Sequence, residues 1–240
     1  MNRTLTPILV VSLMGNLLGL AALYKAFDYR KKMQLAWAQS HDWVSEFNKK
    51  VATHAQDVQN PSLVFLGASI TAHWDLAKFF PKRPYVNKGI DGQYTGQLLL
   101  RFQHDVIDLH PYGVVIKFCE MNFGHDVPFE ITRDNMIMMV TLAKANGIKP
   151  ILASVLPVSK AADKKKGEKS INYQVHAFNH WLREYAKQHQ LSLVDFAGAV
   201  SDEDGFLRSE LTEDGVHPNA RGYQIMTTAV NETLKNKIER

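Results

Sequence analysis

The sequence predicts an α/β fold, in which helices cover both faces of a parallel β-sheet. After residue 60, short apolar runs of strand length alternate with longer segments whose apolar residues recur at helical spacing. Such alternation is typical of parallel sheets, because a helix joins each strand to the next. The chain has 240 residues, which is enough for one domain with its own core and a further segment.

The chain begins with a candidate membrane anchor. Residues 5–24 contain no charged residue and have the length of a helix that crosses a bilayer. A cleaved signal peptide is the alternative, with Gly19, Leu20 and Ala21 as its cleavage site. Because the apolar run is longer than a usual signal core and a basic cluster follows it, we predict that residues 1–25 form an uncleaved, single-pass transmembrane helix.

Two rules disagree on the side of the membrane that the rest of the chain occupies. Lys25, Arg30, Lys31 and Lys32 follow the apolar run, and the positive-inside rule places them in the cytoplasm. A short N-terminal tail often stays inside, however, and this places the following domain outside. We favour the extracytoplasmic side.

The remaining elements follow in order along the chain. Residues 26–60 contain neither proline nor glycine and predict a helical stalk, or a first helix packed on the domain. Asn60-Pro61 ends this segment, and residues 61–240 form the predicted domain. Its predicted strands are residues 62–66, 85–87, 114–119, 150–156 and 191–196. Its predicted helices are residues 96–107, 128–146, 171–188 and 220–237.

Composition excludes several classes of protein. Cys119 is the single cysteine, so the chain has neither an intrachain disulfide nor a CxxC zinc site, and we expect this side chain in the core. The net charge is +4, but the basic residues are not interleaved with aromatic ones on one face, so we expect no nucleic-acid partner. A lysine-rich stretch predicts a solvated loop, or a loop that attracts an anionic substrate or a lipid headgroup (Lys160, Lys164, Lys165, Lys166 and Lys169).

A serine stands where the first predicted strand ends abruptly. Ser69 follows Gly67, and it could be a nucleophile, a phosphate contact or a helix cap. Near the C-terminus, Asp214 and His217 are three residues apart on a turn that Gly215 opens. A serine nucleophile needs a base, and the base needs a group that orients it. Asp214 and His217 could supply both, although such a pair is weak evidence by itself.

Candidate oxyanion donors follow the next two strands. Gly89 and Gly92 follow the second strand, where backbone N–H groups can approach a ligand closely. Asn122 follows the third strand. Two or three donors aimed at one point stabilise the oxyanion of an acyl-transfer reaction. The N–H of Ser69, the N–H of Gly92 and the amide of Asn122 would be those donors.

These motifs together resemble the SGNH/GDSL hydrolase family. The order Gly-x-Ser-x-Thr, Asn-x-Gly-x-x-Gly, an Asn after the third strand and Asp-Gly-x-His-Pro-Asn extends over residues 62–237. The resemblance implies a three-layer α/β/α, flavodoxin-like fold over residues 61–240 and hydrolysis of esters or thioesters without a metal or cofactor. It also implies roles for individual residues: nucleophile (Ser69), base (His217), its partner (Asp214) and oxyanion donors (Ser69, Gly92 and Asn122).

The chain departs from this family pattern at two positions. Ala68 stands where the family usually has Asp, so the turn around Ser69 lacks a polar anchor. Glu120 stands where the family often has Gly, which brings a carboxylate close to a site that must stabilise negative charge. Lys88 or Lys117 could neutralise it, and we predict a Lys88–Glu120 pair.

Four further histidines and a tryptophan are candidates for binding. We predict that His73, Trp74 and His125 contact substrate, although helix packing or loop solvation would also explain them. His176 and His180 have the spacing of metal ligands on a helix, but Ala177 replaces the glutamate of the zincin pattern, so we expect surface histidines and no metal.

The sequence therefore predicts a serine esterase or acylhydrolase anchored in a membrane. Its substrate would be a small-molecule ester, or an ester of a lipid or of an acetylated cell-envelope glycan. Three alternatives stay open: acyl transfer to a sugar, a tethered binding protein with an inactive site, and a nucleotide or flavin site at the loop after the first strand. The oligomeric state is not predicted.

Overall fold

The computed structural model describes residues 24–25, 60–125, 127–166 and 169–235. The chain divides into two units, 1–55 and 56–240, and in the first unit only the helical residues Tyr24 and Lys25 are described. Apart from Tyr24 and Lys25, the predicted membrane segment lies outside these ranges, as do almost all of residues 26–60. Within the described ranges, no helix is both long and apolar enough to cross a membrane.

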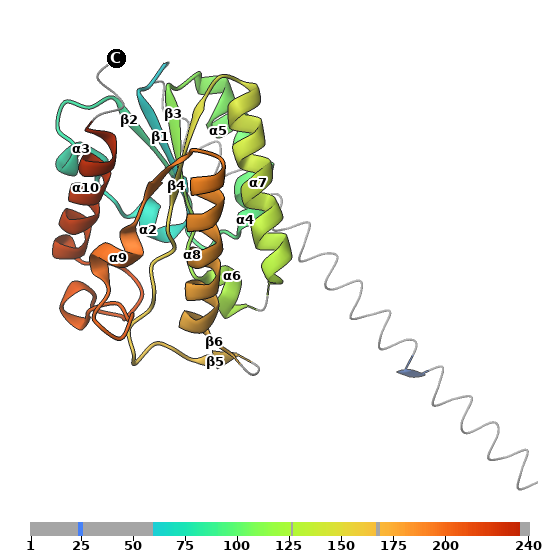
Figure 1. Ribbon diagram of the computed structural model, residues 1–240, viewed down its shortest axis with the longest axis vertical. Helices are drawn as coiled ribbons and strands as arrows, with labels where there is room; N and C mark the ends of the chain where they lie inside the picture. Colours follow the sequence, from blue (N-terminus) through green and yellow to red (C-terminus); the bar gives the residue numbers. More distant parts are fainter. Residues whose placement is uncertain (1–23, 26–59, 126, 167–168, 236–240) are drawn as a thin grey trace, which may run out of the picture. The chain divides into compact units, whose positions relative to one another are not determined.

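The second unit is built on a five-stranded sheet in which every neighbouring pair of strands is parallel, as predicted. The spatial order is β2-β1-β3-β4-β7, so the chain starts near the middle of the sheet and extends it first to one edge and then to the other (Figure 1). The strands are β1 (Leu63–Gly67), β2 (Tyr85–Gly89), β3 (Gly113–Lys117), β4 (Lys149–Ala153) and β7 (Ser192–Val194).

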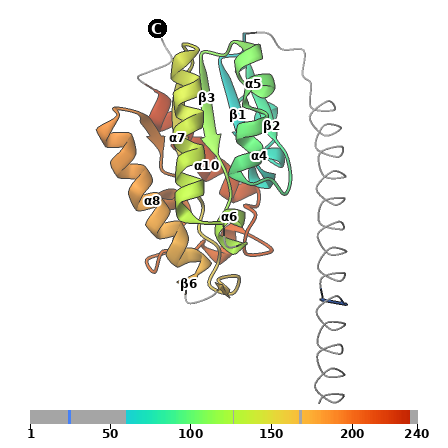
Figure 2. The same cartoon turned by 90° about the vertical axis from the view of Figure 1, so that its right-hand side faces the viewer.

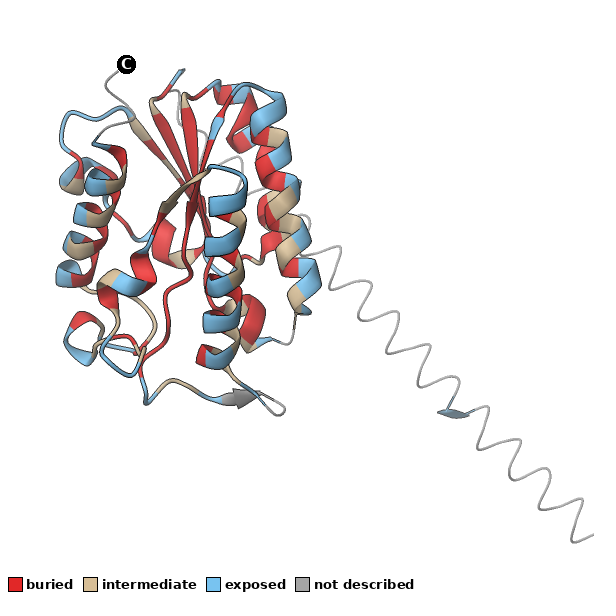
Figure 3. Ribbon diagram, viewed as in Figure 1, coloured by how far each residue is buried: buried red, intermediate tan, exposed pale blue. Residues whose placement is uncertain are grey.

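Helices cover both faces of this sheet and complete the predicted three layers (Figures 1 and 2). One apolar core lies under α4 (Thr95–Leu100), α5 (Phe102–Asp105), α7 (Phe129–Ala145) and α8 (Ile171–Gln188). A second core lies under α2 (Ser69–Ala72), α3 (Leu76–Phe79), α9 (Phe196–Val200) and α10 (Ala220–Leu234). Figure 3 shows the buried residues of each helix facing the sheet.

β1 and β3 are buried along their whole length because both of their faces meet a core. This is why their sequences are continuous apolar runs rather than alternating ones. Glycine lets α2 lie close to the sheet at Gly89, the last residue of β2. A Cβ atom there would come within 2.1 Å of the backbone nitrogen of Ala72.

The structure differs from the predicted elements at several ends. The predicted helix at 96–107 is divided into α4, α5 and the 3-10 turn η1 (Ile107–Leu109), with the first break at the buried Arg101. The predicted strand at 150–156 ends at Ala153, because the side chain of Asn179 hydrogen-bonds both backbone groups of Val155 in place of a neighbouring strand.

Short elements between the predicted ones are new. They are α2, α3, α6 (Met121–Gly124), α9, the 3-10 turn η2 (Ser209–Leu211), and a hairpin of β5 (Lys165–Lys166) and β6 (Lys169–Ser170). The hairpin lies within the lysine-rich stretch that the sequence predicted as a loop. Elements of two to five residues leave too little periodicity for a sequence to reveal them.

Candidate active site

Ser69 is the first residue of α2, immediately beyond the carboxyl end of β1. Gly67 must be a glycine here, since a Cβ atom would come within 2.0 Å of the Thr71 hydroxyl and 2.3 Å of the Lys117 carbonyl oxygen. The chain therefore turns sharply from strand to helix, and the Ser69 side chain stays partly exposed. This places its hydroxyl at the edge of the sheet where ligands bind in parallel α/β folds.

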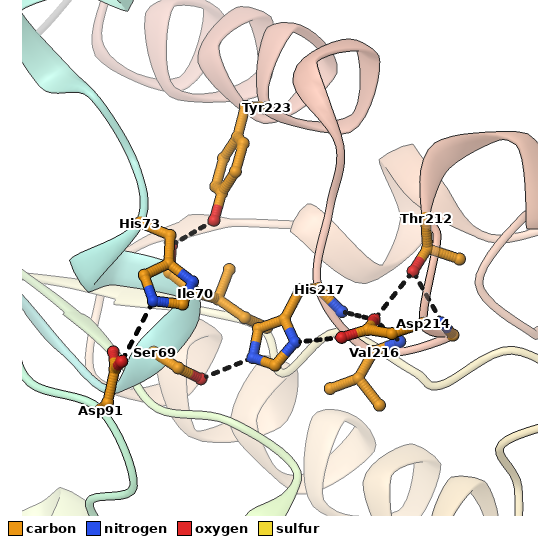
Figure 4. A network of polar contacts seen from close by, with 10 residues as sticks. Ser69, Ile70, His73, Asp91, Thr212, Asp214, Val216, His217 and Tyr223 are labelled. Atoms are coloured by element: carbon orange, nitrogen blue, oxygen red, sulfur yellow. Dashed lines mark hydrogen bonds and ion pairs between the residues drawn. The ribbon is translucent and has the colours of Figure 1, made fainter.

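His217 lies beside Ser69, although 148 positions separate them. The Nε2 atom of His217 is 3.0 Å from the Ser69 hydroxyl, and its Nδ1 atom is 2.6 Å from a carboxylate oxygen of Asp214 (Figure 4). The three side chains form a continuous row from hydroxyl to imidazole to carboxylate. The structure thus brings together the three residues for which the sequence predicted catalytic roles.

The turn that carries Asp214 and His217 is held by its own hydrogen bonds. One Asp214 carboxylate oxygen accepts from the backbone N–H groups of Val216 and His217, at 2.9 and 2.8 Å. Gly215 has a φ of +84°, which favours glycine. Asn219, rather than Asp214, caps α10 by accepting from two N–H groups of its first turn. The carboxylate of Asp214 is therefore directed to the imidazole and its turn, not to the helix.

The charge of Asp214 decides where the imidazole carries its proton. Partial burial raises the pKa of Asp214, but the hydrogen bonds from the His217 ring and from the backbone of His217 and Val216 outweigh it, so the pKa lies well below its usual range. An ionised carboxylate only accepts hydrogen bonds. Nδ1 of His217 must then donate to Asp214, which leaves Nε2 of neutral His217 to accept from the Ser69 hydroxyl.

The loop after β2 reaches the same site. His73 follows α2, and its ring centroid is 5.6 Å from that of His217. Its Nε2 atom is 3.1 Å from the carboxylate of Asp91, the residue before Gly92 (Figure 4). Gly92 has a φ of +73° and is exposed. The structure therefore keeps His73 at the rim of the site and places the Gly92 turn next to it.

Asn122 is held differently from the sequence prediction. It is fully buried, and its amide nitrogen donates to the hydroxyl groups of Thr95 and Thr132, at 2.8 and 2.9 Å. Its amide oxygen accepts from the backbone N–H of Thr95 at 3.3 Å. Both amide hydrogens are already donated, so this arrangement leaves none for an oxyanion. Asn122 instead ties the start of α4 to α6 and α7.

Trp74 and His125, the other two predicted substrate contacts, lie in different environments. Trp74 is buried in the core against Phe65, Phe80 and Tyr223, so it does not line an open pocket. A large aromatic ring directly after a short helix packs against the sheet because this removes its apolar surface from water. His125 is exposed at the end of α6, with its ring edge-to-face against Tyr94.

Comparison with known proteins identifies the family of this chain. The model of the GDSL-like lipase/acylhydrolase family matches residues 65–225. The chain belongs to this family. A crystal structure of a GDSL-like lipase from Bacteroides thetaiotaomicron is 32% identical, with a TM-score of 0.68, and the match covers 80% of this chain and 97% of that one. Lipases and acylhydrolases, which give the family its description, are enzymes that hydrolyse esters.

One solved structure of lower identity shares the fold, and one curated protein matches in sequence. An acetylxylan esterase from Geobacillus stearothermophilus has a TM-score of 0.60 at 19% identity, over 77% of this chain and 99% of that one. An uncharacterized lipoprotein, YqeF, of Bacillus subtilis is 25% identical over 179 residues, which are 61% of this chain and 72% of the relative.

A buried lysine ends the strand next to β1 in this GDSL-like acylhydrolase. Lys117, at the end of β3, is paired in register with Gly67, and among the described residues its Nζ atom has no hydrogen-bond partner. Burial lowers the pKa of Lys117 to about 8, although Cys119 and Glu120 act in the opposite direction. Burial also raises the pKa of the Cys119 thiol to about 11 and raises that of the Glu120 carboxyl.

Two basic residues, Lys117 and His217, act on the buried carboxyl of Glu120. Lys117 and His217 both act to lower the pKa of Glu120 against the effect of burial. The ion pair that the structure shows for Lys88 is with the buried Asp105, at 3.6 Å. The predicted Lys88–Glu120 pair stays a prediction.

We predict that Lys117 makes stability rise between pH 8 and 9. In this window the folded protein loses the Lys117 proton while the unfolded chain, with a lysine pKa near 10.4, keeps it, so raising the pH favours folding by about 1 kcal/mol. The Cys119 thiol acts in the opposite direction in the same window, because its pKa of about 8.5 in the unfolded chain lies below its folded value, so the contribution of Lys117 is the difference between the wild-type chain and Lys117→Met. Urea unfolding of the wild-type chain and of Lys117→Met at both pH values measures the effect.

Lys117→Met should remove this rise, whereas Lys144→Met, an exposed lysine on α7, should leave it in place. A rise of equal size in the wild-type and Lys117→Met proteins would contradict the prediction.

Two residues that the sequence analysis did not single out support the site. The Asn87 amide donates to the backbone oxygens of Thr71 and Trp74, at 2.7 and 2.9 Å, and so fixes the C-terminal end of α2 on β2. Arg101 contacts the backbone just before the serine turn. Asn87 belongs to the Asn-x-Gly-x-x-Gly motif and could have been found there, whereas no pattern marked Arg101.

The histidines at metal-ligand spacing are both exposed on α8. In the described ranges, no group of three or more His, Cys, Asp and Glu side chains is placed to hold a metal ion.

Proposed function

We propose that this acylhydrolase is a serine esterase that works through an acyl-enzyme. Ser69 attacks the ester carbonyl carbon, and Nε2 of His217 takes the hydroxyl proton. His217 then gives this proton to the departing alcohol. A water molecule, activated by His217 in the same way, releases the acid from Ser69.

The observation that carries the proposal is the row of hydrogen bonds from Ser69 through His217 to Asp214. A serine hydroxyl is a weak nucleophile by itself, and a neutral imidazole that accepts its proton is the group that activates it. A phosphate or flavin site would have no use for an imidazole held by a carboxylate in this position. The arrangement therefore favours acyl transfer over binding.

We propose two backbone donors for the oxyanion, the N–H groups of Ser69 and Gly92. Ser69 is the first residue of α2, so its N–H has no partner within the helix. Gly92 lies in the exposed turn next to His73. In this proposal Asn122 is not an oxyanion donor, because its amide hydrogens are donated to the hydroxyl groups of Thr95 and Thr132. Its role is to hold the start of α4 in place.

The alcohol part of the substrate, we propose, is polar. On the side of Asp214, a cavity of about 440 Å³ is lined by Asp214 and Gly215, but not by Ser69 or His217. The rest of its lining is hydroxyl and charged side chains together with two alanines (Ser159, Lys164, Ser209, Thr212, Glu213, Ala161 and Ala162). Hydroxyl and charged groups suit an acylated sugar better than a long hydrocarbon chain. His73 and His125, both exposed, are further candidates for contacts with such a substrate.

The test uses the full-length protein with p-nitrophenyl esters and a serine-directed phosphonate. Hydrolysis and stoichiometric phosphonylation would support the proposed function, and faster hydrolysis of the acetate than of the octanoate would support a short acyl group. Preference for octanoate would favour a lipid ester instead. A folded protein that neither hydrolyses the esters nor reacts with the phosphonate would overturn the proposal. Membrane attachment through residues 1–25 stays a separate prediction.

A further inference from the structure

Arg101 is a buried residue with contacts on two sides of the candidate site. It stands between α4 and α5 and is only 2% exposed. Its Nε atom donates to the side-chain oxygen of Gln93 at 2.7 Å, and its Nη2 atom donates to the carbonyl oxygen of Gly67 at 2.8 Å. Its Nη1 atom donates to the carboxylate of Asp105.

The two acceptors on either side of Arg101 border the two proposed oxyanion donors. Gly67 ends β1 and stands two positions before Ser69. Gln93 is the residue directly after Gly92 and is itself buried. One planar guanidinium therefore joins the turn that carries the Ser69 N–H to the turn that carries the Gly92 N–H. Because its donors are fixed in one plane, it holds these two turns at a set separation.

The guanidinium is itself held in one orientation. Asp105 is fully buried and lies four positions after Arg101, at the end of α5. The same carboxylate also contacts Nδ1 of His104 at 2.8 Å and Nζ of Lys88 at 3.6 Å. An arginine fixed by such a network supports the turns it contacts more rigidly than a mobile side chain would.

The serine turn needs a support of this kind in this chain. Ala68 is buried in the apolar core and has no polar side-chain atom with which to anchor the turn. The contact from Arg101 to Gly67 reaches the turn from the other core, under α4 and α5. The carbonyl of Gly67 also accepts from the backbone N–H of Ile90 at 3.2 Å, so strand β2 and Arg101 hold it together.

We propose that Arg101, acting with Gln93, is a positioning residue that sets the separation of the Ser69 and Gly92 N–H groups and so forms the oxyanion hole. The inference rests on the proposed function. An oxyanion donor contributes only when it lies at hydrogen-bond distance from the position of the developing charge. Loss of the link between the two turns should therefore slow the chemical steps and leave binding of the ester itself nearly unchanged.

The experiment compares full-length Gln93→Leu, Arg101→Lys and the double variant with the wild-type chain. Each protein is titrated to completion with the serine-directed phosphonate, and kcat for p-nitrophenyl acetate is calculated per reactive serine. This removes any effect of a smaller folded fraction. The inhibition constant of phenylboronic acid, which forms a tetrahedral adduct with a serine, is measured in parallel.

Gln93→Leu should lower kcat per reactive serine by about tenfold, because a small displacement of reacting groups has effects of this order. Arg101→Lys keeps a positive charge beside Asp105 but cannot reach both acceptors, and should lower kcat by about a hundredfold. KM should change by no more than about twofold in either, while the inhibition constant rises in parallel with the loss of kcat. The double variant should lose no more than Arg101→Lys alone, because both changes break the same link.

Asn179→Leu is the matched control. Asn179 is another buried amide with two hydrogen bonds, to the backbone of Val155, and it lies on α8 rather than on either turn. This variant should be less stable than the wild-type chain but should keep its kcat per reactive serine.

The outcomes separate the inference from the function on which it rests. If the wild-type chain is active and both Gln93→Leu and Arg101→Lys keep its kcat and inhibition constant, the inference is overturned and the proposed function stands. Losses that simply multiply in the double variant also overturn it, since independent effects do not share one link. A wild-type chain without hydrolysis or phosphonylation overturns both.

Discussion

Replacing Ser69 with alanine should reduce ester hydrolysis by the full-length protein by about 10³-fold or more. The substitution removes the atom that forms the acyl-enzyme, and only water attack within the binding site would remain. The fold should persist, because Ser69 is partly exposed and its hydroxyl contacts the His217 ring rather than the core. The measurements are kcat/KM for p-nitrophenyl acetate, phosphonate labelling, and the urea unfolding midpoint.

His217→Ala should cause a loss of the same order, because the residues of a triad act as a unit. Two matched controls should retain wild-type activity. Ser201→Ala removes a partly buried hydroxyl at the end of α9, and His180→Ala removes an exposed ring on α8. Hydrolysis at the wild-type rate by Ser69→Ala would show that another group performs the reaction.

The second large effect is expected for Asp214→Asn, which should lower kcat by about 10²–10⁴-fold. The asparagine oxygen can still accept the backbone N–H groups of Val216 and His217, so the turn should keep its shape. Its amide, however, carries hydrogens and no charge. The amide can donate to Nδ1, and the ring proton then lies on Nε2. A protonated Nε2 cannot accept the proton of the Ser69 hydroxyl.

The loss in Asp214→Asn should be seen at every pH between 5 and 9. The pKa of Asp214 is well below its usual range, so the wild-type carboxylate is ionised throughout this interval. The sign of the linkage is that of a depressed acid. Its stabilising contribution is complete above about pH 4 and disappears as the pH falls through the lower folded value.

Asp202→Asn is the matched control for the second prediction, since Asp202 also accepts a backbone N–H, from Phe206, in an exposed turn. It should keep full activity at each pH. Wild-type kcat in Asp214→Asn, or a loss that occurs only near pH 5, would contradict the orienting role of Asp214.

Much of the fold was predictable because long periodic segments carry their own signal. The helix predicted at 171–188 is observed with the same bounds, since a long amphipathic helix repeats its pattern over many turns. The prediction of one continuous helix at 96–107 was wrong. Its pattern is helical on both sides of Arg101, and only the contacts of that side chain with Gly67 and Gln93 mark the break.

The sequence names the candidate catalytic residues but not the contacts that hold the surrounding side chains in place. Ser69, Asp214 and His217 could be named as candidates because the order of their motifs is specific, and the structure brings their side chains together. The roles of Asn122 and Trp74 depend on which neighbours satisfy an amide or cover an aromatic ring, and these neighbours are Thr95, Thr132 and the second apolar core. Such contacts join residues far apart in the chain, so local patterns do not reveal them.

The sequence by itself determined the class of fold, the family and the three residues that carry the proposed chemistry. These follow from residue types at fixed local spacing, such as a serine after a buried strand and a histidine three positions after an aspartate. Only the tertiary structure shows that the Asn122 amide hydrogen-bonds two threonines, that Trp74 is core, and that Arg101 contacts two turns. Hydrogen-bond partners and burial are settled only when distant segments pack together. Packing removes polar groups from water, and each buried group then needs a hydrogen-bond partner among the residues packed around it.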